Sequence, residues 1–212
     1  MSAQSTILLA ILLPLAGAVG IALAGRVSAN ARETVTLVTA GGLALTVWSL
    51  LPSVMAGGRP AVTVTELLPG VELAFRVEPL GMLFAALASG LWIVNSLYSI
   101  GYMRGNNEKH QTRFYVMFAV SLAATMGVAF AGNLITLFLF YEMLTLSTYP
   151  LVSHKGDANT VRSARVYLGI LLTTSIGLFL PAIIWTYTVA GGGDFVAGGI
   201  LAGHVEGPAI GL

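Results

Sequence analysis

Residues 114–152 read FYVMFAVSLAATMGVAFAGNLITLFLFYEMLTLSTYPLV. Two apolar runs in this stretch, 114–130 and 134–152, each come close to the length that crosses about 30 Å of hydrocarbon. Only the tripeptide Ala-Gly-Asn at 131–133 joins them. Gly and Asn favour turns, and so short a link allows only an antiparallel arrangement of two helices. The stretch therefore predicts a transmembrane helical hairpin with an uncharged turn.

The composition is that of an integral membrane protein. Apolar residues make up 56% of the 212 positions and charged residues only 9%, which no water-soluble domain of this size would match. A net charge of +1 gives no reason to expect a nucleic-acid partner. The chain has no cysteine, so disulfides, iron–sulfur clusters and thiolate metal sites are excluded. His110, His154 and His204 all fall in polar loops, where no pair could hold a haem between membrane helices. No metal or cofactor is expected.

The whole chain contains six apolar runs long enough to span a bilayer. They are residues 6–24, 35–54, 80–100, 114–130, 134–152 and 166–189. The first run has no basic residue ahead of it and is too long for a signal-peptide core, so it predicts a membrane helix. Pro181 lies inside the sixth run, where it should kink the helix or leave a backbone carbonyl without a donor. The predicted fold is an all-α membrane protein, a bundle of six transmembrane helices.

The distribution of basic residues predicts the orientation. The loops on one side of the membrane carry eight Lys or Arg residues, namely Arg26, Arg32, Arg104, Lys109, Arg113, Lys155, Arg162 and Arg165. The opposite side carries only Arg59 and Arg76. Because cytoplasmic loops are enriched in Lys and Arg, the eight-residue side is expected to be cytoplasmic. Both termini are then outside, in a bacterial-type inner membrane.

A short external β-hairpin is predicted between the second and third spans. Residues 62–77 read VTVTELLPGVELAFRV, with alternating residues on both sides of Pro69-Gly70. A two-stranded ribbon is marginally stable alone. It is therefore expected to lie on the membrane domain or to pair with a neighbour, and an ordered loop with no partner is the alternative. The tail at 190–212 is rich in Gly, but its GxxxG motif lies outside any apolar span and does not predict helix packing.

Glu142 is an acidic residue in the middle of a membrane run. An ionised carboxylate there costs at least about 2.5 kcal/mol, so the group should be protonated, paired or turned toward internal water. On a helix, Thr145 and Tyr149 share its face and can exchange hydrogen bonds with it. Two interpretations remain open. Glu142 either exchanges protons or is a neutral residue that holds helices together.

Two stretches resemble one family. Residues 114–156 extend the opening stretch through SHKG, and residues 77–105 read VEPLGMLFAALASGLWIVNSLYSIGYMRG. Both are similar to the antiporter-like proton-translocating subunits of respiratory complex I and of multisubunit Mrp-type sodium/proton antiporters. In that family a Gly/Asn turn leads into a fifth helix that bears Phe-Trp/Tyr-Glu, which matches residues 140–142. The resemblance covers essentially the whole chain.

The resemblance implies roles for individual residues. Glu142 matches the glutamate that exchanges protons in the half-channel, and His154 with Lys155 matches the polar exit of the fifth helix, where protons would enter from the cytoplasm. The alternative for His154 and Lys155 is that both are simply solvated. Glu78-Pro79 matches the acidic residue and proline that open the third helix, and ordinary helix capping is its alternative.

The chain also departs from the family. Pro150 stands where relatives carry an apolar helix former, so the fifth helix is expected to end early. Full-length members have further helices in two inverted repeats, and the lysine that pairs with the glutamate comes from their seventh helix. None of the six apolar runs here contains a Lys or Arg.

The chain is therefore expected to be the N-terminal portion of a proton-translocating subunit, either a split subunit or a truncation. Its partners would be the lipid bilayer and other membrane subunits, including a chain that supplies the missing C-terminal helices and lysines. A structural subunit of the same kind of complex is one alternative, and an independent small-molecule transporter is another. Any NADH-quinone oxidoreductase activity would belong to the whole complex.

Overall fold

The structure is a computed structural model that describes residues 2–205. Its elements are α1 (Ala3–Ala24), α2 (Ala29–Trp48), α3 (Leu51–Met55), β1 (Ala61–Leu68), β2 (Val71–Arg76), α4 (Pro79–Gly105), α5 (Gln111–Ala129), α6 (Leu134–Val152), α7 (Ala158–Thr174), the π-helical turn η1 (Ser175–Phe179) and α8 (Leu180–Ala190). α2 continues into α3, and α7 continues through η1 into α8. The described residues thus contain six helical segments long and apolar enough to cross a membrane. The predicted six-span helical bundle with one β-hairpin is confirmed.

Polar caps set the first residues of several helices. Ser28 accepts a hydrogen bond from the Ala31 amide at 3.0 Å, so α2 begins at Ala29, six residues before the predicted apolar run at 35. Asp157 accepts one from the Thr160 amide at 3.1 Å, and α7 begins at Ala158 rather than 166. The predicted ranges mark the apolar runs, whereas the polar first turns also fold as helix.

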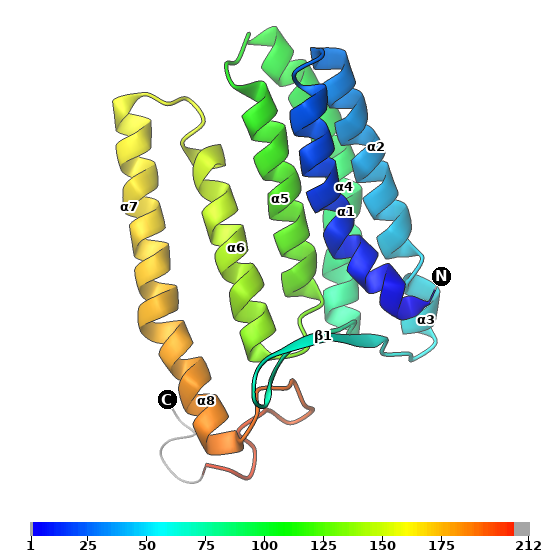
Figure 1. Cartoon of the computed structure of the whole chain (residues 1–212), viewed down its shortest axis with the longest axis vertical. Helices are drawn as coiled ribbons and strands as arrows, with labels where there is room; N and C mark the ends of the chain where they lie inside the picture. The colour runs from blue at the N-terminus through cyan, green and yellow to red at the C-terminus, as the bar shows by residue number, and fades with distance from the viewer. Residues whose placement is uncertain (1, 206–212) are drawn as a thin grey trace.

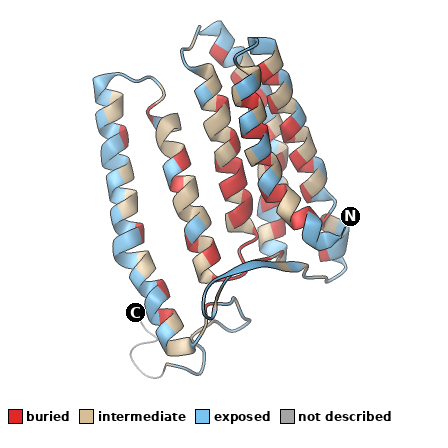
Figure 2. Ribbon diagram, viewed as in Figure 1, coloured by how far each residue is buried: buried red, intermediate tan, exposed pale blue. Residues whose placement is uncertain are grey.

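The helices form a compact group of four and a looser pair. Figure 1 shows α1, α2, α4 and α5 together, with α6 beside α5 and the α7–α8 segment outermost. Buried residues are concentrated in the group of four (Figure 2), including Ile7, Leu43, Trp92 and Met126, all at most 2% exposed. The α7–α8 segment exposes most of its side chains, because it contacts few other elements of this chain.

We call the end of the bundle that carries β1 and β2 the hairpin end, and the opposite end the basic end. β1 and β2 pair antiparallel, and β2 also binds the turn between α5 and α6. The Arg76 amide donates to the Phe130 carbonyl at 2.7 Å, and the Gly132 amide donates to the Ala74 carbonyl at 2.9 Å. Asn133 Nδ2 donates to the Glu72 carbonyl at 2.8 Å. The hairpin therefore packs on the membrane domain, one of the arrangements expected for it.

The tail is folded against the same turn. The Leu134 amide donates to the Gly193 carbonyl at 2.9 Å, and the Phe195 amide donates to the Gly132 carbonyl at 3.2 Å. Arg76 Nη1 also donates to the Phe195 carbonyl, at 3.1 Å. Residues 193–195 thus join β2 and the α5–α6 turn in one hydrogen-bonded layer at the hairpin end. Residues 206–212 of the predicted tail lie outside the described residues.

The two helix-internal prolines of the last two spans act differently. The expectation that Pro150 would end the fifth helix early is wrong, since α6 continues to Val152. Pro150 stands in the last turn, where its missing N–H removes only one hydrogen bond. Pro181 follows the π-helical turn η1, in which the Leu180 amide donates to the Ser175 carbonyl, five residues earlier. The predicted irregularity of the sixth span is thus a widened turn just before the proline.

Candidate functional site

Glu142 lies at the middle of α6. It is the ninth residue of a helix of 19 residues, so at about 1.5 Å rise per residue it is roughly 12 Å from the start of the helix. Its Oε1 atom is buried and makes no hydrogen bond within residues 2–205. None of the three ion pairs among these residues includes Glu142. The structure therefore shows a mid-span carboxyl group with no countercharge in the described part of the chain.

The two residues predicted to support Glu142 lie on its helix but do not bond to it here. Thr145 is buried at 5% exposure, and Tyr149 is half-buried. Their positions, three and seven residues after Glu142, place them on one face of α6. In the described part of the chain, neither side chain forms a hydrogen bond with the carboxyl group. The three residues thus lie on one face of α6 as expected, whereas the hydrogen bonds between them stay a prediction.

Different faces of α6 meet different neighbours. Toward α5, the Ser147 and Ser121 hydroxyl groups form a hydrogen bond of 2.9 Å. Toward η1, the Phe179 ring lies 5.9 Å from the Phe138 ring and 6.2 Å from the Tyr141 ring, centroid to centroid. Phe138 and Tyr141 are the residues four and one before Glu142. The residues that make the aromatic contact between α6 and the sixth span are thus near neighbours of Glu142 along the helix.

His154 and Lys155 follow the end of α6 at the basic end. The His154 carbonyl accepts a hydrogen bond from Arg113 Nη2 at 3.2 Å, and its ring packs edge to face on Phe114 at 5.6 Å. Burial, together with the Arg113 charge, lowers the pKa of the His154 imidazole below its ordinary value. The ring is therefore neutral at pH 7. Lys155 is exposed.

The structure does not bring His154 or Lys155 to Glu142. The 12 residues from Glu142 to His154 correspond to about 18 Å along the helix axis. The interpretation of His154 as a solvated loop residue does not fit either, since both of its ring nitrogens are buried. His154 is a packed residue between the end of α6 and the start of α5.

Glu78 occupies the N-cap position of α4, with Pro79 as the first helical residue. Its side chain caps no backbone amide of α4. Instead its Oε2 accepts a hydrogen bond from Arg59 Nε at 2.9 Å, and both side chains are about half exposed. Glu78 thus begins the helix through its backbone and forms an exposed ion pair at the hairpin end, distant from Glu142 along the chain.

The sequence patterns did not reveal a hydrogen-bonded group at the basic end, which we call the charge cluster: the buried Arg32 and Glu33, the exposed Arg104 and the half-buried Gln111. Arg104 binds Glu33 with both Nη2 and Nε, at 2.5 and 3.0 Å. Arg32 Nη2 binds Glu33 at 2.9 Å and Gln111 Oε1 at 2.8 Å. Arg32 and Glu33 are each only 6% exposed. The cluster therefore ties α4 and α5 to α2 through hydrogen bonds to the buried Arg32–Glu33 ion pair.

The sequence feature that could have revealed part of this cluster is the start of α2. Arg32 and Arg104 were assigned to loops because they lie outside the apolar runs, as Glu33 also does. Ser28 is a strong N-cap residue, and a helix that begins after it includes Arg32 and Glu33 in its first two turns. The partner on α4 could not be found this way, because pairing across 71 positions depends on how the helices pack.

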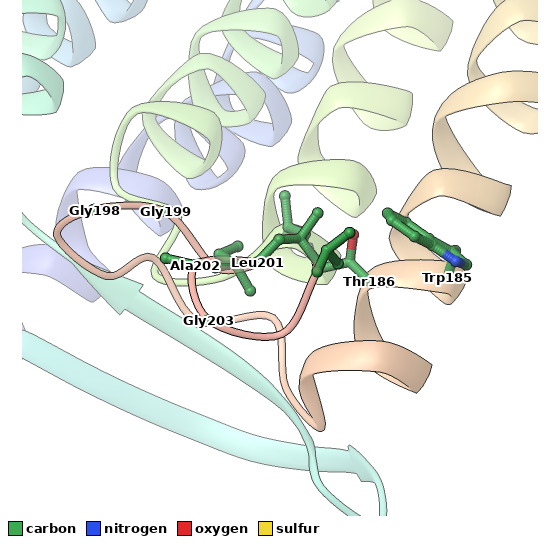
Figure 3. Close-up of a pocket in the computed structure, with 10 residues that line it drawn as sticks. Trp185, Thr186, Gly198, Gly199, Leu201, Ala202 and Gly203 are labelled. Atoms are coloured by element: carbon green, nitrogen blue, oxygen red, sulfur yellow. The ribbon is translucent and has the colours of Figure 1, made fainter. Parts of the chain in front are cut away.

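An apolar pocket of about 840 Å³ lies at the hairpin end. Figure 3 shows Trp185 and Thr186 of α8 beside the loop that carries Leu201 and Ala202. None of the residues predicted to act in proton transfer lines this pocket. It is therefore separate from the Glu142 site.

Comparison with known proteins gives one consistent family. The family described as "NADH:quinone oxidoreductase/Mrp antiporter, TM" matches residues 131–201. The A1 subunit of a Na(+)/H(+) antiporter from Staphylococcus aureus (strain bovine RF122 / ET3-1) is 33% identical over 98 residues, 46% of this chain and 12% of the relative. The A/B subunit of a probable K(+)/H(+) antiporter from Rhizobium meliloti (strain 1021) is 30% identical over 152 residues, 70% of this chain and 14% of the relative. The matched part of the chain thus spans about an eighth of the length of each of these relatives.

Two solved structures share the fold. A chain of the Mrp complex from Dietzia sp. DQ12-45-1b superposes with a TM-score of 0.75 at 23% identity, over 96% of this chain and 21% of that one. A chain of the membrane-bound sulfane sulfur reductase, an archaeal respiratory membrane complex, gives 0.76 at 15% identity, over 89% of this chain and 38% of that one. Together with the sequence matches, they place this multi-pass membrane protein in the antiporter-like subunit family that Mrp-type antiporters and NADH:quinone oxidoreductases share.

Proposed function

We propose that the chain is the N-terminal portion of a proton-translocating subunit in a multisubunit membrane complex, and that Glu142 carries the proton. The observation that supports this most is the mid-span carboxyl group, whose buried Oε1 has no hydrogen-bond partner in the described residues. A charge so placed is costly, and such residues usually mark ion or proton pathways. Thr145 and Tyr149, on the same face, would hydrogen-bond the carboxyl group when water or a partner enters.

The carboxyl group can act as a switch if a cation approaches and leaves it. Burial favours the neutral acid, whereas a nearby ammonium group favours the ionised form. A lysine outside the described residues, on another segment or on a neighbouring chain, would supply that charge. His154 and Lys155 then stand at the end of α6 where protons would enter. His154, being neutral and packed, would serve as a relay only after a change in its contacts.

The proposed location is a bacterial-type inner membrane, with the basic end in the cytoplasm. The exchanged ion is a monovalent metal cation, since two relatives are named as components of Na(+)/H(+) and K(+)/H(+) antiporters. Partner subunits would cover the surface that the α7–α8 segment leaves exposed. A purely structural subunit of the same complex is the alternative.

The substitution Glu142→Gln tests the proposed function. The amide keeps the size and hydrogen-bonding capacity of the neutral acid but cannot release a proton. We expect cation-dependent proton transport by the complete complex to fall roughly 10²-fold, the low end of the range for removal of a proton-transfer group. The measurement is a fluorescent ΔpH assay in inverted membrane vesicles, with the amount of assembled complex determined on the same vesicles.

Glu66→Gln is the matched control, because it makes the same chemical change on the exposed hairpin. It should leave transport and assembly unchanged. Normal transport by Glu142→Gln vesicles would contradict the proposal. Loss of the assembled complex, rather than of transport, would favour the structural alternative.

Single cysteines test the orientation, against a background of no native cysteine. Ser2 lies at the hairpin end before α1, and the exposed Asn106 follows α4 at the basic end. With the basic end in the cytoplasm, a membrane-impermeant maleimide added to intact cells should label Ser2→Cys and not Asn106→Cys. Inverted vesicles should give the reverse pattern. Labelling of both positions from one side would exclude this orientation.

A further inference from the structure

The sixth span contains a π-helical turn at the level where it meets α6. In η1 the Leu180 amide donates to the Ser175 carbonyl, so one turn contains an extra residue. Such turns are rare and are often found at functional sites. η1 also has only one buried residue, Ser175. Packing within this chain therefore does not explain the widened turn.

The local sequence explains why the turn forms here. Pro181 has no amide hydrogen, and its ring would clash with the Gly177 carbonyl in a regular α-helix. Adding a residue to the turn moves that carbonyl away from the ring. Gly177 allows the change at low cost, since glycine adapts readily to altered backbone angles. No neighbour lies within 4 Å of the position of a Cβ atom at Gly177, so its small size is not required by packing.

The turn ends at Phe179, which makes the aromatic contact with α6. Its ring lies 5.9 Å from Phe138 and 6.2 Å from Tyr141. Phe138 is one helical turn before Glu142 on the same face, and Tyr141 is the adjacent residue. The Glu142 Oε1 atom is buried although the residue as a whole is only half-buried. Phe179 thus packs on the two residues of α6 that stand one turn before Glu142 and directly before it.

We propose that Phe179, held against Phe138 and Tyr141 by the π-helical turn, is a positioning residue that controls access of water and protons to Glu142. If the turn returns to α-helical geometry, it contains one residue fewer, and the following part of the helix shifts its register by one residue. The helix on one side then rotates by about 100° relative to the other. That rotation takes the Phe179 ring away from α6 and opens the flank of Glu142. This inference rests on the proposed function, because it concerns the same carboxyl group.

The test measures how fast Glu142 reacts with a water-soluble carbodiimide in membranes that contain the complete complex. The Glu142→Gln variant supplies the background. For Phe179→Ala we expect the rate to rise about tenfold, because two aromatic contacts that hold the flank closed are lost. Leu178→Ala is the matched control, since Leu178 is the preceding residue and is 70% exposed. It should react at the wild-type rate.

Pro181→Ala provides a second, independent variant. It restores the missing amide hydrogen and allows a regular α-helix, so it should also accelerate the reaction while leaving the Phe179 side chain intact. Phe179→Leu, which keeps an apolar side chain at the contact, should fall between wild type and Phe179→Ala. Wild-type rates in both Phe179→Ala and Pro181→Ala, at normal levels of folded protein, would overturn the inference.

The two proposals fail in different ways. If Glu142→Gln keeps full transport while Phe179→Ala still accelerates the carbodiimide reaction, the proposed function is wrong and the control of access remains. If Glu142→Gln abolishes transport while the Phe179 and Pro181 variants react normally, the proposed function remains and Phe179 has no role in access.

Discussion

Replacing Glu33 by Gln is expected to destabilise the folded chain by about 3–5 kcal/mol, the range for removal of one partner from a buried ion pair. Glu33 accepts hydrogen bonds from both Arg32 and Arg104, and its side chain is 8% exposed. Without the carboxylate, Arg32 is left as a buried cation that stacks over the Tyr115 ring at 5.1 Å. The Arg104 side chain is 45% exposed and can return to water. Most of the cost therefore comes from Arg32.

The measurement is unfolding of the purified chain in mild detergent, followed by circular dichroism. Glu66→Gln is again the control, because Glu66 lies on the exposed hairpin. The combined change Arg32→Met, Glu33→Gln should recover part of the lost stability, since it removes the unpaired buried cation. A Glu33→Gln chain as stable as the Glu66→Gln chain would show that the charge cluster contributes no net stability.

The sequence predicted the spans well because membrane helices are encoded locally. A run of apolar residues of the right length has few other structures in hydrocarbon, so all six spans were found, and the alternation around Pro69-Gly70 identified the hairpin. The helix ends were less well predicted. Polar first turns such as that of α2 do not extend an apolar run, and only the cap at Ser28 marks them.

The candidate site was predicted only in part, because only some of its features are encoded locally in the sequence. Glu142 stands out in the sequence because the cost of a charge in hydrocarbon depends on its depth in the membrane. The position of a residue within an apolar run is enough to predict that depth. The charge cluster joins Glu33 to Arg104, and the Phe179 contact joins η1 to α6. Such contacts depend on how helices pack and rotate against one another. No local pattern carries that information.

The packing at the hairpin end depends on one glycine at the start of α4. Gly81 lies in the first turn of α4, and a Cβ atom there would be 2.0 Å from the Ala129 carbonyl oxygen at the end of α5. That oxygen belongs to the backbone, so it cannot move as a side chain would. Ala129 immediately precedes Phe130, whose carbonyl accepts the hydrogen bond from the Arg76 amide. A shift at Ala129 would therefore also disturb the docking of β2.

Gly81→Ala is accordingly expected to destabilise the chain by about 3 kcal/mol, the upper part of the range for overpacking. Gly101→Ala, in the same helix, is the matched control, because no heavy atom lies within 4 Å of its Cβ position. It should be neutral or stabilise the chain by about 0.5–1 kcal/mol, since alanine favours the helix. Both variants can be compared by unfolding in detergent and by protease cleavage of the 61–76 hairpin, which should become faster only in Gly81→Ala. Equal stability of the two variants would mean that α4 and α5 can separate at the hairpin end without cost, and that the contact at Gly81 does not hold the base of the α5–α6 hairpin in place.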